Sequence, residues 1–129
     1  MTALICSALL GPIFIDVFRA GEGGFQQIRI PSLITAKDGT LLAFAEGRNT
    51  NRSDQGENKI ILKRSSDRGL TWAPLQIVDD QGARSLNNPC AVLDQNSGAV
   101  ILMYQSIPAG LAEGSSKIEN GTDGPNIFR

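Results

Sequence analysis

The chain has 129 residues, 41% of them apolar, which is enough for one small domain with a hydrophobic core. Acidic and basic residues nearly cancel to a formal net charge of -1, so nothing in the charge indicates nucleic acid as a partner. The sequence contains no histidine, which excludes Ser-His-Asp and Cys-His catalysis and the usual zinc sites.

The N-terminal stretch MTALICSALLGPIFIDVF is apolar but lacks the basic start of a secretory signal. It is too short, and too broken by Gly-Pro, to cross a bilayer, so no membrane span is predicted. Two interpretations of residues 1–12 stay open, the remnant of a signal or leader and a disordered segment. Residues 13–19 are predicted to form a first strand, and the domain is expected to cover residues 13–129.

Short apolar runs alternate with turn signals along the rest of the chain. Asp-Gly and Asn-Ser-Gly between such runs are typical of hairpins, because Gly and Asn accept positive φ. The predicted strands cover residues 13–18, 28–35, 40–47, 59–66, 75–79, 90–94 and 99–106. Residues 106–129 are rich in Gly, Ser and Asn and are predicted to be a loop that ends where another strand begins. Successive antiparallel hairpins indicate an all-β sandwich, barrel or propeller.

The segment SSDRGLTW fits the pattern Ser-x-Asp-x-Gly-x-Thr-Trp, with the matching residues Ser65, Asp67, Gly69, Thr71 and Trp72. Asp67 is expected to accept hydrogen bonds within a turn, Gly69 to supply positive φ, and Trp72 to pack under the turn. The segment resembles the Asp-box of sialidases and related β-propellers. In that family these boxes lie on the periphery of the blades, so the resemblance implies a structural role for Asp67.

The segments IRIPSLI and LLAFAEGR resemble the start of the catalytic domain of bacterial-type exo-α-sialidases (neuraminidases). Arg29, Ile30 and Pro31 match the family's Arg-Ile-Pro motif, whereas Ile28 stands where an aromatic residue is usual. FRAGEGGF before this motif resembles the family's entry strand, and residues 87–106 resemble its next blade. The motifs follow one another in the family's order.

The resemblance implies that Arg29 is one of three arginines that hold the carboxylate of the sugar. A planar guanidinium suits this role, because it makes paired, charge-assisted hydrogen bonds to a carboxylate. The alternative is a strand arginine that pairs with a nearby Asp or Glu. Arg48 also matches a family arginine near the substrate carboxylate, and its alternative is a surface ion pair with Glu46 or Asp54.

The polar segment NTNRSDQGENK that follows Arg48 corresponds to the family's loop that carries a catalytic Asp. Asp54 lies at about the matching place and is predicted to act as general acid and base, with Glu57 as the competing carboxylate. The alternative is a solvated loop of charged residues. The family's nucleophile is a Tyr, but nothing matches Tyr104 to that motif, and the role is not carried over.

One Asp-box and about seven strands amount to one antiparallel four-stranded blade with parts of its neighbours, an incomplete six-bladed β-propeller. The chain thus resembles the N-terminal portion of a sialidase, and it is expected to expose blade edges and an open core face and to be inactive alone. A secreted or periplasmic location is expected from the usual substrates.

The function implied is exo-α-sialidase hydrolysis of terminal sialic acid from glycans, glycoproteins or gangliosides, with no cofactor and no metal. Two alternatives stay open. One is a non-catalytic Asp-box propeller that binds glycan or protein. The other is a glycosidase of the same fold that acts on another acidic sugar, or a trans-sialidase.

Overall fold

The computed structural model describes residues 11–49, 54–108, 111 and 127–128 and consists of antiparallel strands with one short 3-10 turn. The elements in chain order are η1 (Glu22–Gly24), β1 (Gln27–Thr35), β2 (Leu41–Arg48), β3 (Asn58–Ser65), β4 (Gln76–Asp79), β5 (Ser85–Leu93), β6 (Val100–Ile107) and β7 (Ile127–Phe128).

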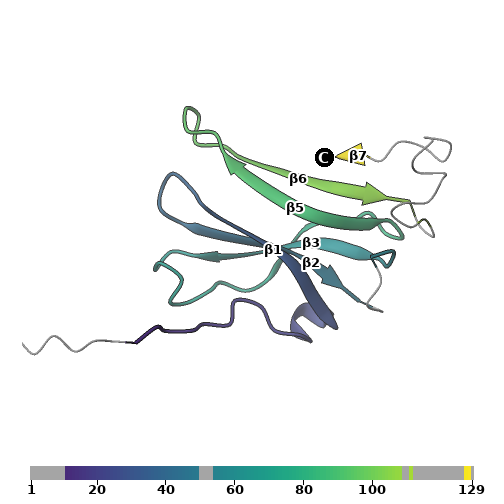
Figure 1. Ribbon diagram of the computed structural model, residues 1–129, viewed down its shortest axis with the longest axis horizontal. Coiled ribbons are helices and arrows are strands. Elements are labelled where there is room, and N and C mark those ends of the chain that lie inside the picture. The colour runs from purple at the N-terminus through teal and green to yellow at the C-terminus, as the bar shows by residue number, and fades with distance from the viewer. Residues whose placement is uncertain (1–10, 50–53, 109–110, 112–126, 129) are drawn as a thin grey trace, which may run out of the picture.

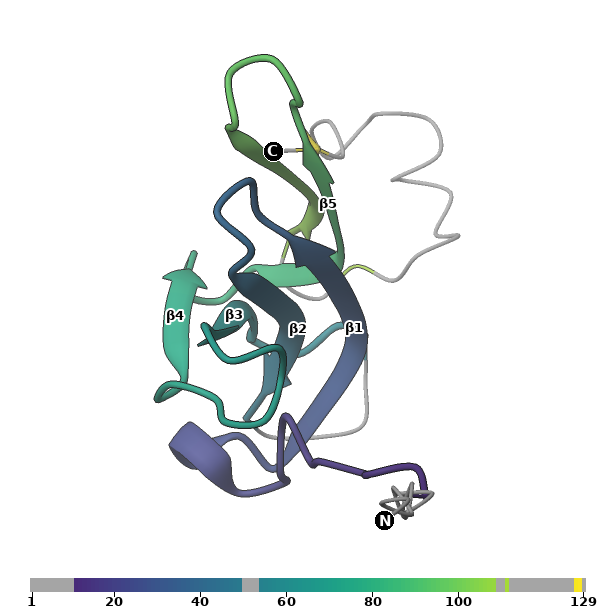
Figure 2. The same ribbon diagram turned by 90° about the vertical axis from the view of Figure 1, so that its left-hand side faces the viewer.

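The strands form two sheets, one with the order β1-β2-β3-β4 and one with the order β5-β6-β7. Strand β5 packs against β1, β2 and β3, so the second sheet lies over one face of the first (Figure 1). Figure 2 shows the four strands of the first sheet side by side. The predicted all-β class and four-stranded antiparallel blade are confirmed.

Strand β2 is central to its sheet and is buried on both faces, with side chains alternating between them. On one face Phe44 packs with Ile60, Leu62 and Leu86 to form the core between the two sheets. Full burial of such a side chain stabilises the fold by roughly 1.5–3 kcal/mol. The same face of β2 continues through Glu46 to Arg48, which places two charged residues at the end of this core.

The other face of β2 carries small residues, and an aromatic ring covers it. Ala45 and Ile61 pack with Phe25, which follows η1, and Phe18 adds to this cluster. A Cβ atom at Gly47 would lie only 2.8 Å from the Phe25 ring, so the close approach requires glycine. The N-terminal segment thus runs along the face opposite β5 (Figure 1).

The prediction of a strand over residues 13–19 is wrong. These residues belong to none of the strands in the described part of the chain, and Ile13 and Phe14 are 69% and 91% exposed. Phe18 is apolar because its side chain packs on one face of the sheet, although its backbone does not pair with a strand. FRAGEGGF likewise contains η1 instead of a strand. Residues 1–10 lie outside the described residues, and so does most of the predicted loop after β6.

Five of the other predicted strands agree with β1, β2, β3, β4 and β6 to within one residue at each end. The strand predicted over residues 90–94 is wrong at its start, because β5 already begins at Ser85. Its first half contains Ser, two Asn and a Pro, a composition typical of loops. The side chains of Ser85 and Asn87 instead form hydrogen bonds with each other and with the Asp54 carbonyl.

The outer face of the second sheet is apolar and exposed. Val92, Ile101 and Met103 are each more than half exposed, and Val92 pairs with Ile101 across β5 and β6. This face agrees with the expected open core face of an incomplete propeller. None of the helices in the part of the chain that the structure describes is long and apolar enough to cross a membrane.

The Asp-box turn joins β3 to β4 through a compact set of hydrogen bonds. The Asp67 carboxylate accepts from the Ser65 hydroxyl at 2.7 Å and from the backbone N–H and hydroxyl of Thr71 at 2.9 and 2.6 Å. Trp72 Nε1 donates to the Gly69 carbonyl at 3.2 Å. The hydrogen bonds from Thr71 and Ser65 lower the pKa of Asp67 to about 2. The structural role predicted for Asp67 matches this geometry.

Asp67→Asn tests the turn through the pH dependence of stability. A lowered pKa in the folded state stabilises the fold above the unfolded pKa, and this contribution is lost as the pH falls through about 2. We expect the variant to have a lower free energy of unfolding than the wild-type protein at neutral pH. This difference should become smaller between about pH 4 and pH 2. Denaturant unfolding across this range measures the difference. Asp16→Asn, at an exposed pair with Arg19, is the control. A difference for Asp67→Asn that does not change with pH would contradict the account.

Candidate active site

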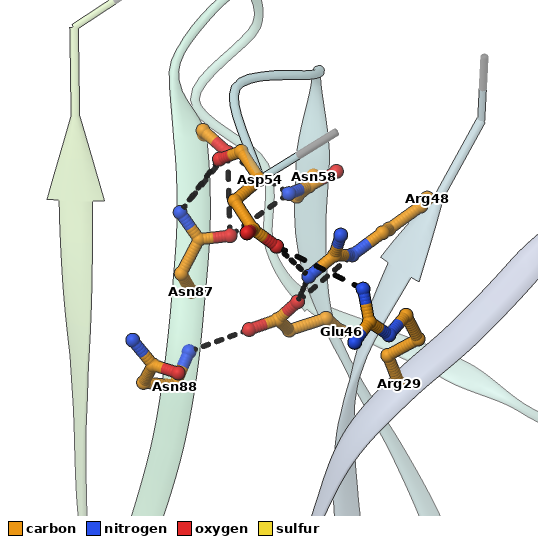
Figure 3. A network of polar contacts seen from close by, with 8 residues as sticks. Arg29, Glu46, Arg48, Asp54, Asn58, Asn87 and Asn88 are labelled. Carbon is orange, nitrogen blue, oxygen red and sulfur yellow. Dashed lines mark hydrogen bonds and ion pairs between the residues drawn. The ribbon is translucent and has the colours of Figure 1, made fainter. Parts of the chain in front are cut away.

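A pocket of about 130 Å³ lies where the ends of β1, β2 and β5 meet the residues before β3. It is lined by Arg29, Ile30, Glu46, Arg48, Asp54, Asn87 and Asn88. Figure 3 shows the charged side chains of β1 and β2 gathered around the Asp54 carboxylate. Sites for small molecules usually measure about 300–1,000 Å³, so this pocket would surround only part of a sugar.

Arg48 and Glu46 form an ion pair that is almost entirely buried, each side chain being 1% exposed. Arg48 Nε donates to Glu46 Oε2 at 2.9 Å, and Arg48 Nη2 donates to the same oxygen. Burial by itself would lower the pKa of the Arg48 guanidinium, but hydrogen bonds to the Glu46 and Asp54 carboxylates outweigh it and raise that pKa. The alternative of an ion pair for Arg48 is therefore observed, inside the protein instead of on its surface.

The Asp54 carboxylate stands between two guanidinium groups. Arg48 Nη2 lies 2.7 Å from Asp54 Oδ1, and Arg29 Nη1 lies 4.0 Å from the same oxygen. The side chains of Arg29 and Asp54 are 47% and 62% exposed, unlike that of Arg48. Arg29 and Asp54 are therefore the charged groups that a ligand can reach.

A β-bulge between Arg29 and Ser32 directs Arg29 to the pocket. Ile28 packs with the cluster under the sheet, whereas Ser32 accepts a hydrogen bond from the backbone N–H of Ala91 on β5. Without an extra residue, Arg29 and Ser32 would point to opposite faces of β1. The bulge contains Ile30 at φ 52, an unfavourable value for a β-branched residue that costs on the order of 1–3 kcal/mol.

Glu46 also links the two sheets. Its Oε1 accepts a hydrogen bond of 2.7 Å from the backbone N–H of Asn88. Asn88 has φ 56 and lies in a bulge of β5 between Asn87 and Cys90, directly before a proline. The bulge of β1 likewise has a positive-φ residue before a proline, so the two strands enter the site with the same backbone irregularity.

The structure brings together Arg29, Arg48 and Asp54, as expected from the sequence. Glu57 is exposed and is not among the residues that line the pocket. Tyr104 lies on β6, where its hydroxyl donates to Asp79 Oδ2 at 2.6 Å. The described residues contain no group of three or more acidic or Cys side chains that could hold a metal ion.

Glu46, Asn87 and Asn88 also line the pocket and were not expected there from the sequence. The signal for Glu46 was its spacing from Arg48, because residues i and i+2 of a strand share a face. Two opposite charges on one face of an otherwise apolar strand indicate a buried pair. The signal for the asparagines was weaker, since Asn before Pro is also typical of turns.

Glu46→Gln tests the buried pair. The substitution leaves the buried Arg48 guanidinium with less compensating charge, so we expect the free energy of unfolding to fall by about 3 kcal/mol or more. Asp16→Asn is the control, because Asp16 pairs with Arg19 at 3.4 Å with side chains that are 71% and 75% exposed, and an exposed pair contributes about 0–1 kcal/mol. Denaturant unfolding measures both. Equal losses in the two variants would contradict the importance of the Glu46 charge.

Curated proteins similar to this chain are sialidases. A sialidase of Micromonospora viridifaciens is 34% identical over 89 residues, which cover 66% of this chain and 14% of that protein. An exo-alpha-sialidase of Aspergillus fumigatus is 30% identical over 105 residues, which cover 77% of this chain and 26% of that protein. The chain thus spans only about 14% and 26% of the length of these two relatives. No family model matches the sequence.

Solved structures that are similar to this chain are sialidases as well. The intramolecular trans-sialidase of Ruminococcus gnavus, solved with oseltamivir carboxylate, matches with a TM-score of 0.67 and 25% identity. The match covers 75% of this chain and 25% of that one. Sialidases are β-propellers, and other solved members match in the same way. The sequence and the fold of this chain therefore place it with the sialidases, and the chain corresponds to a part of their β-propeller.

Proposed function

We propose that the protein is an exo-α-sialidase and that this chain supplies one side of its active site. The observation that carries the proposal is the half-exposed Arg29 facing the Asp54 carboxylate across a pocket, in a chain that resembles sialidases. A cation for the carboxylate of a sialic acid and a carboxyl group for proton transfer then lie side by side.

Arg29 is assigned to the carboxylate of the substrate. The guanidinium keeps its charge at every physiological pH and presents a planar set of donors that matches a carboxylate. Its partial exposure leaves it room for a ligand, whereas Arg48 already binds Glu46 and Asp54 inside the protein. Arg48 is therefore assigned an indirect role, because it holds the Asp54 carboxylate in place. The complex of the Ruminococcus gnavus enzyme with oseltamivir carboxylate fits a site of this charge.

Asp54 is assigned the acid and base role. In the unliganded site its carboxylate faces two cations, Arg48 Nη2 at 2.7 Å and Arg29 Nη1 at 4.0 Å. A substrate carboxylate bound at Arg29 places the sugar beside the Asp54 carboxyl group. Asp54 can then donate its proton to the leaving glycosidic oxygen and afterwards remove a proton from water.

The tyrosine nucleophile that the family resemblance implies is not assigned in this chain. Tyr104 packs beside the core between the sheets and is hydrogen-bonded to Asp79.

The substrates proposed are sialylated glycans, glycoproteins or gangliosides. A secreted or periplasmic location stays a prediction.

Arg29→Ala tests carboxylate recognition. Charge-assisted hydrogen bonds contribute roughly 1.5–3 kcal/mol each, so we expect the affinity for free sialic acid to fall by about 10- to 100-fold. Isothermal titration of the protein encoded by the full gene measures the affinity. Arg19→Ala, at an arginine 75% exposed in a surface pair, should leave it unchanged. Unaltered binding by Arg29→Ala would refute the assignment.

Asp54→Asn tests the acid and base. General acid–base catalysis contributes about 10²–10⁴-fold, so we expect kcat on an unactivated sialoside to fall within that range while sialic acid still binds. Glu57→Gln should retain activity because Glu57 does not line the pocket. The opposite pattern, with Glu57→Gln inactive and Asp54→Asn active, would reassign the role. Binding without any turnover in the unmodified protein would favour the non-catalytic alternative.

A further inference from the structure

We propose that Ser85, Asn58 and Asn87 form a positioning network that fixes the main chain of Asp54 and thereby sets where its carboxylate lies. This inference rests on the proposed function, in which Asp54 is the acid and base. It assigns a role to three polar residues of β3 and β5.

Two of these residues hold the backbone carbonyl of Asp54. The Ser85 hydroxyl donates to this oxygen at 2.7 Å, and Asn87 Nδ2 donates to it at 3.1 Å. Ser85 and Asn87 are only 1% and 3% exposed, whereas the Asp54 side chain is 62% exposed. Buried side chains therefore hold the main chain of a residue whose carboxyl group is accessible. Figure 3 shows Asn87 beside Asp54.

Asn58 completes the network from the neighbouring sheet. Its Nδ2 donates to Ser85 Oγ at 2.9 Å and to Asn87 Oδ1 at 2.8 Å, and Asn87 Nδ2 also donates to Ser85 Oγ at 3.1 Å. Each amide hydrogen of the two asparagines and the hydroxyl hydrogen of Ser85 then has an acceptor. Such a satisfied buried network is rigid, and the loss of one member leaves the others with unpaired groups.

Asp54 is consequently held both through its main chain and through its side chain. The network holds its carbonyl oxygen, and Arg48 holds its carboxylate at 2.7 Å. Loss of the carbonyl anchor would leave Asp54 tethered through an exposed side chain alone. A displacement of about 1 Å in a catalytic group can cost about 10²-fold in rate.

Ser106 offers a matched control for a purely structural role. It is as buried as Ser85, it accepts from Arg84 Nε at 2.7 Å, and it donates to Gln81 Oε1 at 2.8 Å. These partners belong to neither Asp54 nor the pocket lining. Replacing either serine by alanine removes one buried hydroxyl with its hydrogen bonds, so a difference between the variants reports on Asp54.

The test is a double-mutant cycle on the protein encoded by the full gene, with kcat and KM measured on a sialoside. We expect Ser85→Ala to lower kcat by about 10- to 100-fold with little change in KM, and Ser106→Ala to leave both near the wild-type values. In the Asp54→Asn background Ser85→Ala should cause no further loss. Additive losses, or equal effects of Ser85→Ala and Ser106→Ala, would overturn the network's role.

A crystal structure of the Ser85→Ala protein separates this inference from the proposed function, because it needs no activity. We expect the Asp54 main chain to be displaced while Arg29 and Arg48 keep their positions. An unchanged Asp54 would overturn the inference, even if the protein proves to be a sialidase. A displaced Asp54 would support it, even if the protein has no sialidase turnover. If Ser85→Ala does not fold, Asn58→Ala removes the support of Ser85 and Asn87 and is judged by the same criterion.

Discussion

The buried ion pair between Glu46 and Arg48 is the interaction on which the site depends. Both side chains are 1% exposed, so neither charge could remain there without the other. Arg48 Nη2 also contacts the Asp54 carboxylate, and Glu46 accepts a hydrogen bond from the backbone of β5 through its second oxygen. One pair of charges therefore joins the two sheets and also holds the carboxyl group that faces the pocket.

We assign different roles to the two arginines of the site because their side chains differ in exposure. Arg48 is enclosed by Glu46 and Asp54 and stabilises the architecture, whereas the half-exposed Arg29 can meet a ligand. The bulge that turns Arg29 towards the pocket places Ile30 at positive φ, an unfavourable conformation that the packing between the sheets must support. Strain of this kind is more often retained near functional sites than elsewhere in a fold.

The sequence predicts those parts of the fold that rest on local patterns. Apolar runs between turn signals correctly indicated β1, β2 and β3, and the Asp-box residues form the expected turn. The apolar residues 13–18 led to a wrong strand prediction, because Phe18 packs on a face of the sheet without pairing with one of its strands. The start of β5 could not be predicted, because Ser85 and Asn87 have partners around Asp54 that are more than 30 residues away in the sequence. Arg29 and Asp54 were predicted as site residues only through the resemblance to sialidases. Without it, a strand arginine in an ion pair and a solvated loop of charged residues are the better interpretations.

The most direct test of the account is a crystal structure of the protein encoded by the full gene in complex with sialic acid. We expect the sugar carboxylate to lie within hydrogen-bond distance of the Arg29 guanidinium. We also expect Asp54 to face the anomeric oxygen and Arg48 to remain paired with Glu46. A sugar carboxylate bound away from Arg29, with Asp54 turned out of the pocket, would refute the role assigned to this site.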